Sequence, residues 1–417
     1  MGFEQALSGL QAASQNLDII GNNIANASTV GFKEVRAEFA DVYAASLLGG
    51  GANQIGIGTA VAAVTPEFTQ GTITTTGNPL DVAINGGGFF REVKNGVVSY
   101  SRDGQFSLDA NGFIVSPSGA NLTGYPATAT GAISVSPPVP MQLSLAPVMP
   151  SATTTASLQL NLDSSKPVIT TAFNPADPTT YTSSTAQTVY DSLGGNHTIE
   201  YYFVNSGPGT TAGTTNWTVY AAGDNTLIAG AGANGSIGTL TFDGTGHLNP
   251  AADVPLSVSL PVTTGATTPL TFTTTFPYAS TSAFSSSFAL NKNTQNGFAT
   301  GQLSSFNISS TGVISGQYTN GQTVTLGQIA MAAFTNPQGL LAQGNNQFAE
   351  TAASGAPNVG APGTGSLGSV QSGALENSTV DITTELVTMI TAQRVYQANA
   401  ETVKTQDQVQ QTLMSLR

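Results

Sequence analysis

The chain has 417 residues, of which only 8% are charged, and its 10 basic and 23 acidic residues give a formal net charge of −13. So few lysines and arginines offer no basic patch for phosphates, which argues against nucleic acid and anionic membranes as partners. The absence of cysteine excludes disulfides, thiolate chemistry and cysteine metal sites, and no apolar run is long enough to predict a membrane-spanning helix.

A heptad-like apolar pattern predicts a helix over residues 3–26. Glycine inside an exposed helix costs about 1 kcal/mol relative to alanine. Gly21, on the apolar stripe, could offset this cost by letting a second helix approach closely, or it could simply break the helix. We expect the chain to turn near 26–31. The large apolar residues of the stripe are spaced by three, four or seven positions; they are Phe3, Leu7, Leu10, Leu17 and Ile24.

Two segments rich in small residues are predicted to be flexible linkers. The first spans residues 33–75 and includes the dense glycines of 49–58, which leave the backbone unrestrained. The second spans 352–373, where glycine, alanine, proline and serine dominate. We expect both linkers to connect a helical part to a β-rich part.

Alternating apolar and polar residues predict β-strands over most of the remaining chain. Strand patterns begin near residue 80 and resume after 303, separated by Asp-Gly and Asn-Gly turns. We therefore predict an inner β domain formed by residues 76–147 and 286–351. The threonine-rich segment 148–285 is predicted to be an outer β domain, a sandwich or flattened barrel, with hinges near 148 and 285.

The last segment, residues 374–417, lacks glycine and proline and predicts one long helix from about residue 382. Ser378 and Asp381 can satisfy the free N–H groups at its start. A helix this long without its own core must pack on something, so we expect it to pair with residues 3–26 and with other copies. Its apolar stripe consists of Ile382, Leu386, Met389, Tyr396 and Val403.

The order of elements is nested, and it brings both chain ends together. The predicted fold class is multidomain α+β with discontinuous domains. Residues 1–32 and 374–417 form a terminal helical coiled-coil domain, and two mainly-β domains follow outward.

Candidate catalytic and ligand sites are weak. Asp191, Ser192 and His197 resemble part of a triad, but a polar hairpin edge explains them better. The glycines at 86–88 lack the following helix that a phosphate loop needs, and 109–112 lacks the closing glutamate of a calcium loop. We expect no enzyme activity and no catalytic, cofactor or metal residues.

Four segments resemble the flagellar rod and hook family of axial proteins. Residues 8–33 and 373–417 resemble its N- and C-terminal signatures, and NPLDVAINGGGFF (78–90) and residues 100–125 resemble its inner β domain. Distal rod proteins of the family are much shorter chains, and TFDGTGHL (241–248) is similar to the outer domain of hook proteins. The resemblance therefore favours a hook subunit, with a distal rod-type subunit as the alternative.

The resemblance implies a self-assembling, flexible helical tube that acts as a universal joint, transmits motor torque to the filament and encloses an export channel. It implies export by the flagellar type III apparatus to an extracellular hook without a cleaved signal peptide, and the N-terminal sequence shows no such peptide. Implied partners are the distal rod protein, the hook cap protein and the hook–filament junction protein. A different class, a threonine-rich adhesin that binds glycans, would usually carry a signal peptide.

Overall fold

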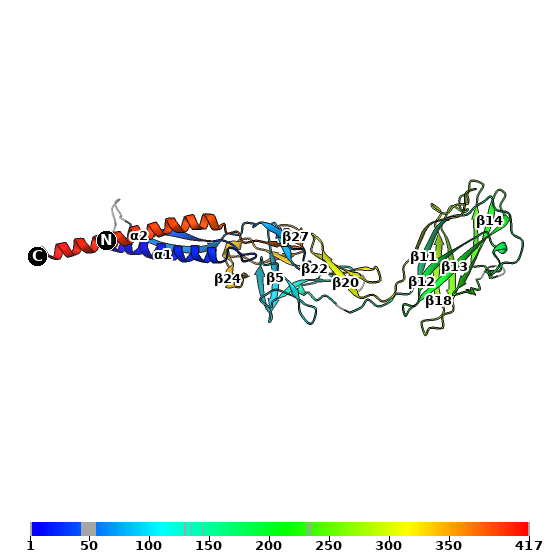
Figure 1. Cartoon of the computed structure of the whole chain (residues 1–417), viewed down its shortest axis with the longest axis horizontal. Helices are drawn as coiled ribbons and strands as arrows, with labels where there is room; N and C mark the ends of the chain where they lie inside the picture. The colour runs from blue at the N-terminus through cyan, green and yellow to red at the C-terminus, as the bar shows by residue number, and fades with distance from the viewer. Residues whose placement is uncertain are drawn as a thin grey trace. The chain divides into compact units, whose positions relative to one another are not determined.

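The computed structural model describes residues 2–42, 56–128, 131–134, 136–144, 146–230, 232 and 235–415. Part of the predicted first linker, residues 43–55, lies outside them. The chain divides into two compact units, Met1–Leu145 with Ser305–Gly316 and Thr323–Arg417, and Ala146–Ser304 with Gln317–Gln322 (Figure 1). Terminal helices combined with β units confirm the predicted multidomain α+β class.

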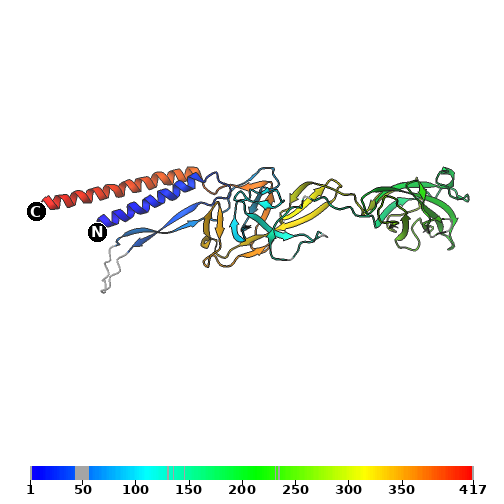
Figure 2. The ribbon, with the colours of Figure 1, turned by 90° about the horizontal axis from the view of Figure 1, so that it is seen from below.

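Two antiparallel helices form one end of the first unit (Figure 2). Helix α1 (Gly2–Ala25) ends where the sequence predicts a turn, and α2 (Ile382–Ser415) is ten residues longer, 34 against 24. The helix N-cap is Asp381, because its Oδ1 accepts hydrogen bonds from the backbone N–H groups of Thr383 at 2.8 Å and Thr384 at 3.1 Å. The prediction that Ser378 caps this helix was wrong, since its hydroxyl accepts from Val380 before the helix begins.

A β-hairpin lies along α1, in the described part of what the sequence predicted to be a flexible linker. Strands β1 (Val35–Val42) and β2 (Gly58–Pro66) pair antiparallel. A Cβ at Gly58 would lie 2.0 Å from Ser8 Oγ, so this glycine permits close contact with α1 rather than flexibility. The linker prediction was wrong here because it rested on the dense glycines of 49–58 and overlooked the alternating pattern of exposed and half-buried residues in β2.

The β-rich part of the first unit is built on a 13-stranded sheet in the described residues, with central order β20-β21-β22-β9-β5-β6-β25-β24. The predicted linker 352–373 belongs to this part, because β26 pairs with β23 and β27 pairs with β4. Its core includes Phe90, Leu122 and Ile329. The strands are β3 (Ile73–Thr75), β4 (Val82–Asn85), β5 (Phe89–Lys94), β6 (Val97–Ser101), β7 (Ser107–Leu108), β8 (Ile114–Val115), β9 (Asn121–Pro126), β10 (Val139–Pro140), β20 (Leu303–Ile308), β21 (Val313–Tyr318), β22 (Thr323–Ile329), β23 (Met331–Ala333), β24 (Leu341–Gly344), β25 (Gln347–Ala349), β26 (Asn358–Gly360), β27 (Ser369–Ser372) and β28 (Ala374–Glu376).

The second unit is a sandwich of two sheets, ordered β17-β18-β11-β19 and β12-β13-β14-β15 with β16 beside β14. Trp217, Phe203 and Leu158 belong to its core. Its strands are β11 (Thr155–Asn161), β12 (Ser183–Tyr190), β13 (Asn196–Pro208), β14 (Thr215–Gly223), β15 (Thr226–Leu227), β16 (Gly238–Phe242), β17 (Val254–Leu260), β18 (Leu270–Phe276) and β19 (Ala289–Gln295).

The second unit, which we call the outer unit because it contains the predicted outer β domain, extends beyond the predicted boundary at 285. Strand β19 pairs with β11, and two bridges, Val148 with Gly301 and Ser151 with Phe298, join the chain where it enters and leaves the unit. The boundary prediction was wrong because β19 is an almost fully exposed polar strand, which has the composition of a loop.

Candidate functional site

Small and polar residues line the face on which the two helices meet. Two contacts set the register of α1 against α2. A Cβ at Gly9 would lie 3.0 Å from the side-chain amide atoms of Asn399, and the amide nitrogen of Asn23 lies 3.5 Å from Glu385 Oε1. Small side chains let the two backbones approach closely. The buried residues of the two helices are Ala6, Ala12, Ala13, Ile20 and Asn23 of α1 and Glu385 and Ala392 of α2.

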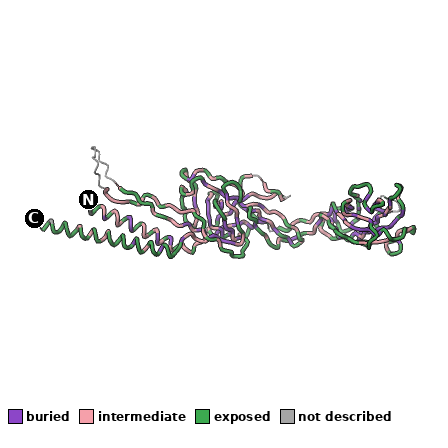
Figure 3. Tube along the Cα trace, turned by 90° about the horizontal axis from the view of Figure 1, so that it is seen from above, coloured by how far each residue is buried: buried purple, intermediate pink, exposed green. Residues whose placement is uncertain are grey.

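Half of the large apolar residues predicted to join the helices are exposed rather than buried between them. Leu7 and Leu386 are 42% and 46% exposed, and much of the outer surface of α2 is exposed in Figure 3. This exposure contradicts the prediction for the five exposed residues, which are not buried between the helices of one chain; for the other five, packing within the chain stays a prediction. Phe3, Leu7, Ile382, Leu386 and Tyr396 are exposed, whereas Leu10, Leu17, Ile24, Met389 and Val403 are half-buried; we call these ten residues the apolar stripe.

Gly21 does not provide the close helix contact that the sequence suggested. A Cβ at Gly21 would meet nothing within 4 Å, whereas one at Gly9 would meet α2. Helix α1 nevertheless continues through Gly21 to Ala25, so the glycine does not break it either. Because exposed large apolar side chains on neighbouring helices can mark an interaction site, the apolar stripe is the main candidate functional surface.

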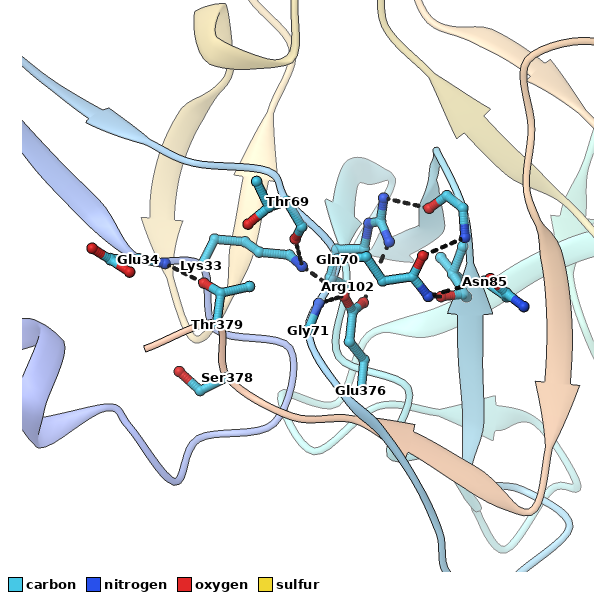
Figure 4. A network of polar contacts seen from close by, with 12 residues as sticks. Lys33, Glu34, Thr69, Gln70, Gly71, Asn85, Arg102, Glu376, Ser378 and Thr379 are labelled. Carbon is cyan, nitrogen blue, oxygen red and sulfur yellow. Dashed lines mark hydrogen bonds and ion pairs between the residues drawn. The ribbon is translucent and has the colours of Figure 1, made fainter. Parts of the chain in front are cut away.

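A buried ionic cluster joins the segments that follow α1 and precede α2 to the β-rich part of the first unit, which we call the inner β domain (Figure 4). Glu376 Oε1 lies 2.7 Å from Lys33 Nζ, and Oε2 lies 3.3 Å from Arg102 Nη1. The backbone N–H of Gly71 also donates to Oε1 at 2.8 Å, and Lys33 donates to the Thr69 carbonyl at 2.6 Å. The three charged side chains are at most 4% exposed, so they are almost entirely removed from water.

Burial lowers the pKa of Lys33 and the pKa of Arg102, while attraction to Glu376 opposes both changes. One carboxylate therefore holds two desolvated cations from different segments. Lys33 follows α1, Arg102 follows β6, and Glu376 ends β28 shortly before α2. No sequence pattern indicated this cluster, whose only signal was three charged residues in a chain that has few.

Additional bonds brace the same junction. The Glu34 N–H donates to Thr379 Oγ1 at 2.8 Å, and the Gly31 N–H donates to the Glu376 carbonyl at 2.8 Å. Gly31 has a φ of +68°, and a Cβ there would lie 2.7 Å from the Arg102 backbone. The chain can therefore leave α1 in this way only with glycine at this position.

The residues that suggested a catalytic triad form a different arrangement in the outer unit. His197 Nε2 lies 3.3 Å from Asp191 Oδ2, and Nδ1 lies 2.5 Å from Asp224 Oδ2. Both ring nitrogens face carboxylates, so neither is placed to accept a proton from Ser192, whose Oγ accepts from the Thr267 N–H. His197 therefore connects the turn at Asp191 with the turn at Asp224, and we call this arrangement the clamp.

This clamp predicts that the outer unit loses stability as the pH rises. Burial alone would lower the pKa of His197, but its hydrogen bonds to Asp224 and Asp191 raise it above the ordinary 6.5. The protonated clamp therefore contributes fully below about 6.5, the pKa of an unfolded histidine, and is lost as the pH passes the higher folded value. We expect the melting temperature of the outer unit to fall as the pH rises from about 6.5 through the higher folded pKa of His197, and His197→Gln to weaken that dependence. Equal pH profiles for both proteins would contradict the clamp.

Within the described ranges, no group of three or more histidine or acidic residues is arranged to hold a metal ion. No helix there is long and apolar enough to cross a membrane.

Four family models match successive parts of the chain. Residues 3–33 match the flagella basal body rod protein and 83–157 the flagellar hook protein FlgE/F/G D1 domain. Residues 161–298 match the flagellar basal body protein FlaE D2 domain, and 371–416 the flagellar basal body rod FlgEFG protein C-terminal. The D2 match ends at 298, the residue that bridges to Ser151 at the exit of the outer unit.

Relatives match along the whole chain. The flagellar hook protein FlgE of Salmonella typhimurium is 43% identical over 421 residues, covering 100% of both chains, and that of Treponema pallidum is 31% identical, covering 99% of this chain and 98% of its own. A solved Helicobacter pylori hook protein, FlgE2, shares the fold at a TM-score of 0.52 and 16% identity, over 73% of this chain and 100% of its own. The chain belongs to the flagellar hook protein FlgE family and is a structural subunit of the flagellar hook.

Proposed function

We propose that the apolar stripe is the surface through which copies of this chain polymerise into the hook tube. The observation that carries the proposal is the exposure of large apolar side chains on two helices whose inner faces are already occupied. Burying one such side chain is worth about 1.5–3 kcal/mol, so several per subunit supply enough free energy to hold a polymer together. The buried ionic cluster fixes these helices to the inner β domain.

In the proposed tube the helices surround the export channel and the β domains lie outside. At the two ends of the tube the stripe contacts other axial proteins, the distal rod protein below and the hook cap and hook–filament junction proteins above. The match of residues 3–33 to a rod protein model supports a shared mode of contact. Export through the flagellar type III apparatus, without a cleaved signal peptide, places the subunit outside the cell.

Flexibility of the tube is assigned to the outer unit and to the two chain segments that lead into it. We propose that contacts between outer units are weak and exchangeable. The low share of charged residues, 8% of the chain, supports this because few strong ion pairs can form.

Two matched deletions test this division of roles. Removing residues 152–297 and joining Ser151 to Phe298 by a two-residue Asn-Gly turn preserves a bridge that already pairs these residues through reciprocal 3.0 Å hydrogen bonds. We expect this variant to form tubes of altered stiffness in electron micrographs. Removing 382–415 should abolish tubes. Tubes from the second variant would refute the proposal.

A further inference from the structure

An apolar groove lies between α1, α2 and the β1–β2 hairpin. Its volume is about 520 Å³, and none of its lining residues carries a charge. Gly9, Ala12, Ala13 and Ala392 form part of its wall, and the larger Phe39 and Val395 also line it. The groove exists because the facing helix residues are small, so they leave space beside the hairpin that their own side chains do not fill.

Helix α2 continues past the end of its partner. The contacts of Gly9 with Asn399 and of Asn23 with Glu385 fix an antiparallel register that places Gly2 level with Gln406. Residues 407–415 therefore have no α1 counterpart and extend about 13 Å beyond it. On this overhang Val409 is 49% exposed and Met414 is 80% exposed.

We propose that the overhang of α2 from one copy of this chain occupies the groove of a second copy. This inference rests on the proposed polymerisation and names one of its contacts. The overhang of the same chain cannot fill the groove, because α2 lines the groove at Thr388–Asn399 and then runs straight onward. Only another copy can present these residues to it.

The chemistry of the two surfaces is complementary. The groove is uncharged, and the overhang has one charged residue, Asp407, at its beginning. Filling the groove would cover exposed apolar side chains on both partners, including Met414 and half-exposed Phe39.

Disulfide cross-linking can test the contact, and only the introduced cysteines can react because the natural chain contains none. One variant carries Thr391→Cys in the groove and the other Met414→Cys on the overhang. Polymer assembled from an equal mixture should give a disulfide-linked dimer on oxidation, and the unpolymerised mixture should not. Gln393→Cys is the matched control, since two residues turn a helix by about 200° and place it opposite Thr391.

The outcomes separate this inference from the proposed function. Tubes in which Met414→Cys links to Gln393→Cys, or to neither position, would overturn the groove contact while leaving assembly through the apolar stripe intact. If Thr391→Cys prevents assembly, Val395→Cys on the same groove wall replaces it. A groove that instead retains an added peptide or apolar molecule in the washed polymer would also overturn the inference.

Truncation after Gln406 gives an independent measurement. The monomer should melt at an unchanged temperature, because the overhang has no α1 partner in its own chain. The concentration needed for polymerisation should rise roughly tenfold or more, the effect of losing about one buried apolar side chain per contact. An unchanged polymerisation threshold would overturn the inference, and loss of monomer stability would show that the overhang serves its own chain.

Discussion

Replacing Leu386 with aspartate should abolish tube formation and leave the monomer folded. Leu386 is 46% exposed on α2, so a carboxylate there stays hydrated in the free subunit. In the tube the same carboxylate would be buried between subunits without a cation. The variant loses about 1.5–3 kcal/mol of apolar burial per subunit and adds a desolvation cost of several kcal/mol. Every subunit bears this cost, so even a modest cost per contact prevents growth of a polymer.

Electron microscopy and sedimentation velocity measure the effect of Leu386→Asp on assembly. Leu386→Met is the matched control, because methionine conserves volume and apolar character and should cost less than about 1.5 kcal/mol. Circular dichroism of the two monomers should agree, which shows that the aspartate acts on assembly rather than on folding. Normal tubes from Leu386→Asp would remove the apolar stripe from the assembly surface.

The existence of both helices could be predicted from sequence, but their contacting faces could not. Uninterrupted apolar periodicity and the lack of proline determine helix formation locally. Which face is buried depends on how closely two backbones approach, and here Gly9 and alanines permit the close contact. The larger leucines, which dominate an apolar pattern, stay exposed or half-buried in the single chain. The sequence pattern thus identified the apolar residues of both helices, but not which residues the helices of one chain bury.

Local composition misled the prediction wherever tertiary contacts decide the structure. In the β1–β2 hairpin, the sequence suggests that Gly58 interrupts regular structure. In the fold, the missing side chain of Gly58 leaves the space that Ser8 of α1 occupies. Strand β19 is polar because it lies at the edge of its sheet and is exposed to solvent. It is nevertheless a regular strand, because it pairs with β11. Lys33 and Glu376 are 343 positions apart, and no local pattern predicts that they meet.

Replacing Glu376 with alanine should destabilise the first unit more than the removal of any surface charge. The change leaves Lys33 and Arg102 buried without their shared anion, and breaking a buried pair costs about 3–5 kcal/mol. It also leaves the Gly71 N–H without its acceptor. Urea unfolding followed by circular dichroism should show a lower midpoint for the transition that includes the helices.

Glu67→Ala provides the control for Glu376→Ala, because Glu67 pairs with Arg36, whose side chain is 68% exposed. Loss of an exposed pair costs at most about 1 kcal/mol. A similar small loss for Glu376→Ala would show that water reaches the cluster and that it does not fix the helices. The expected large loss would show that the cluster holds the helices on the inner domain. Hydrogen exchange at the Gly71 N–H should then accelerate in Glu376→Ala, because its acceptor is the Glu376 carboxylate. The Gly31 N–H donates to the backbone carbonyl of residue 376, which alanine keeps, so its exchange should accelerate only if the junction itself loosens.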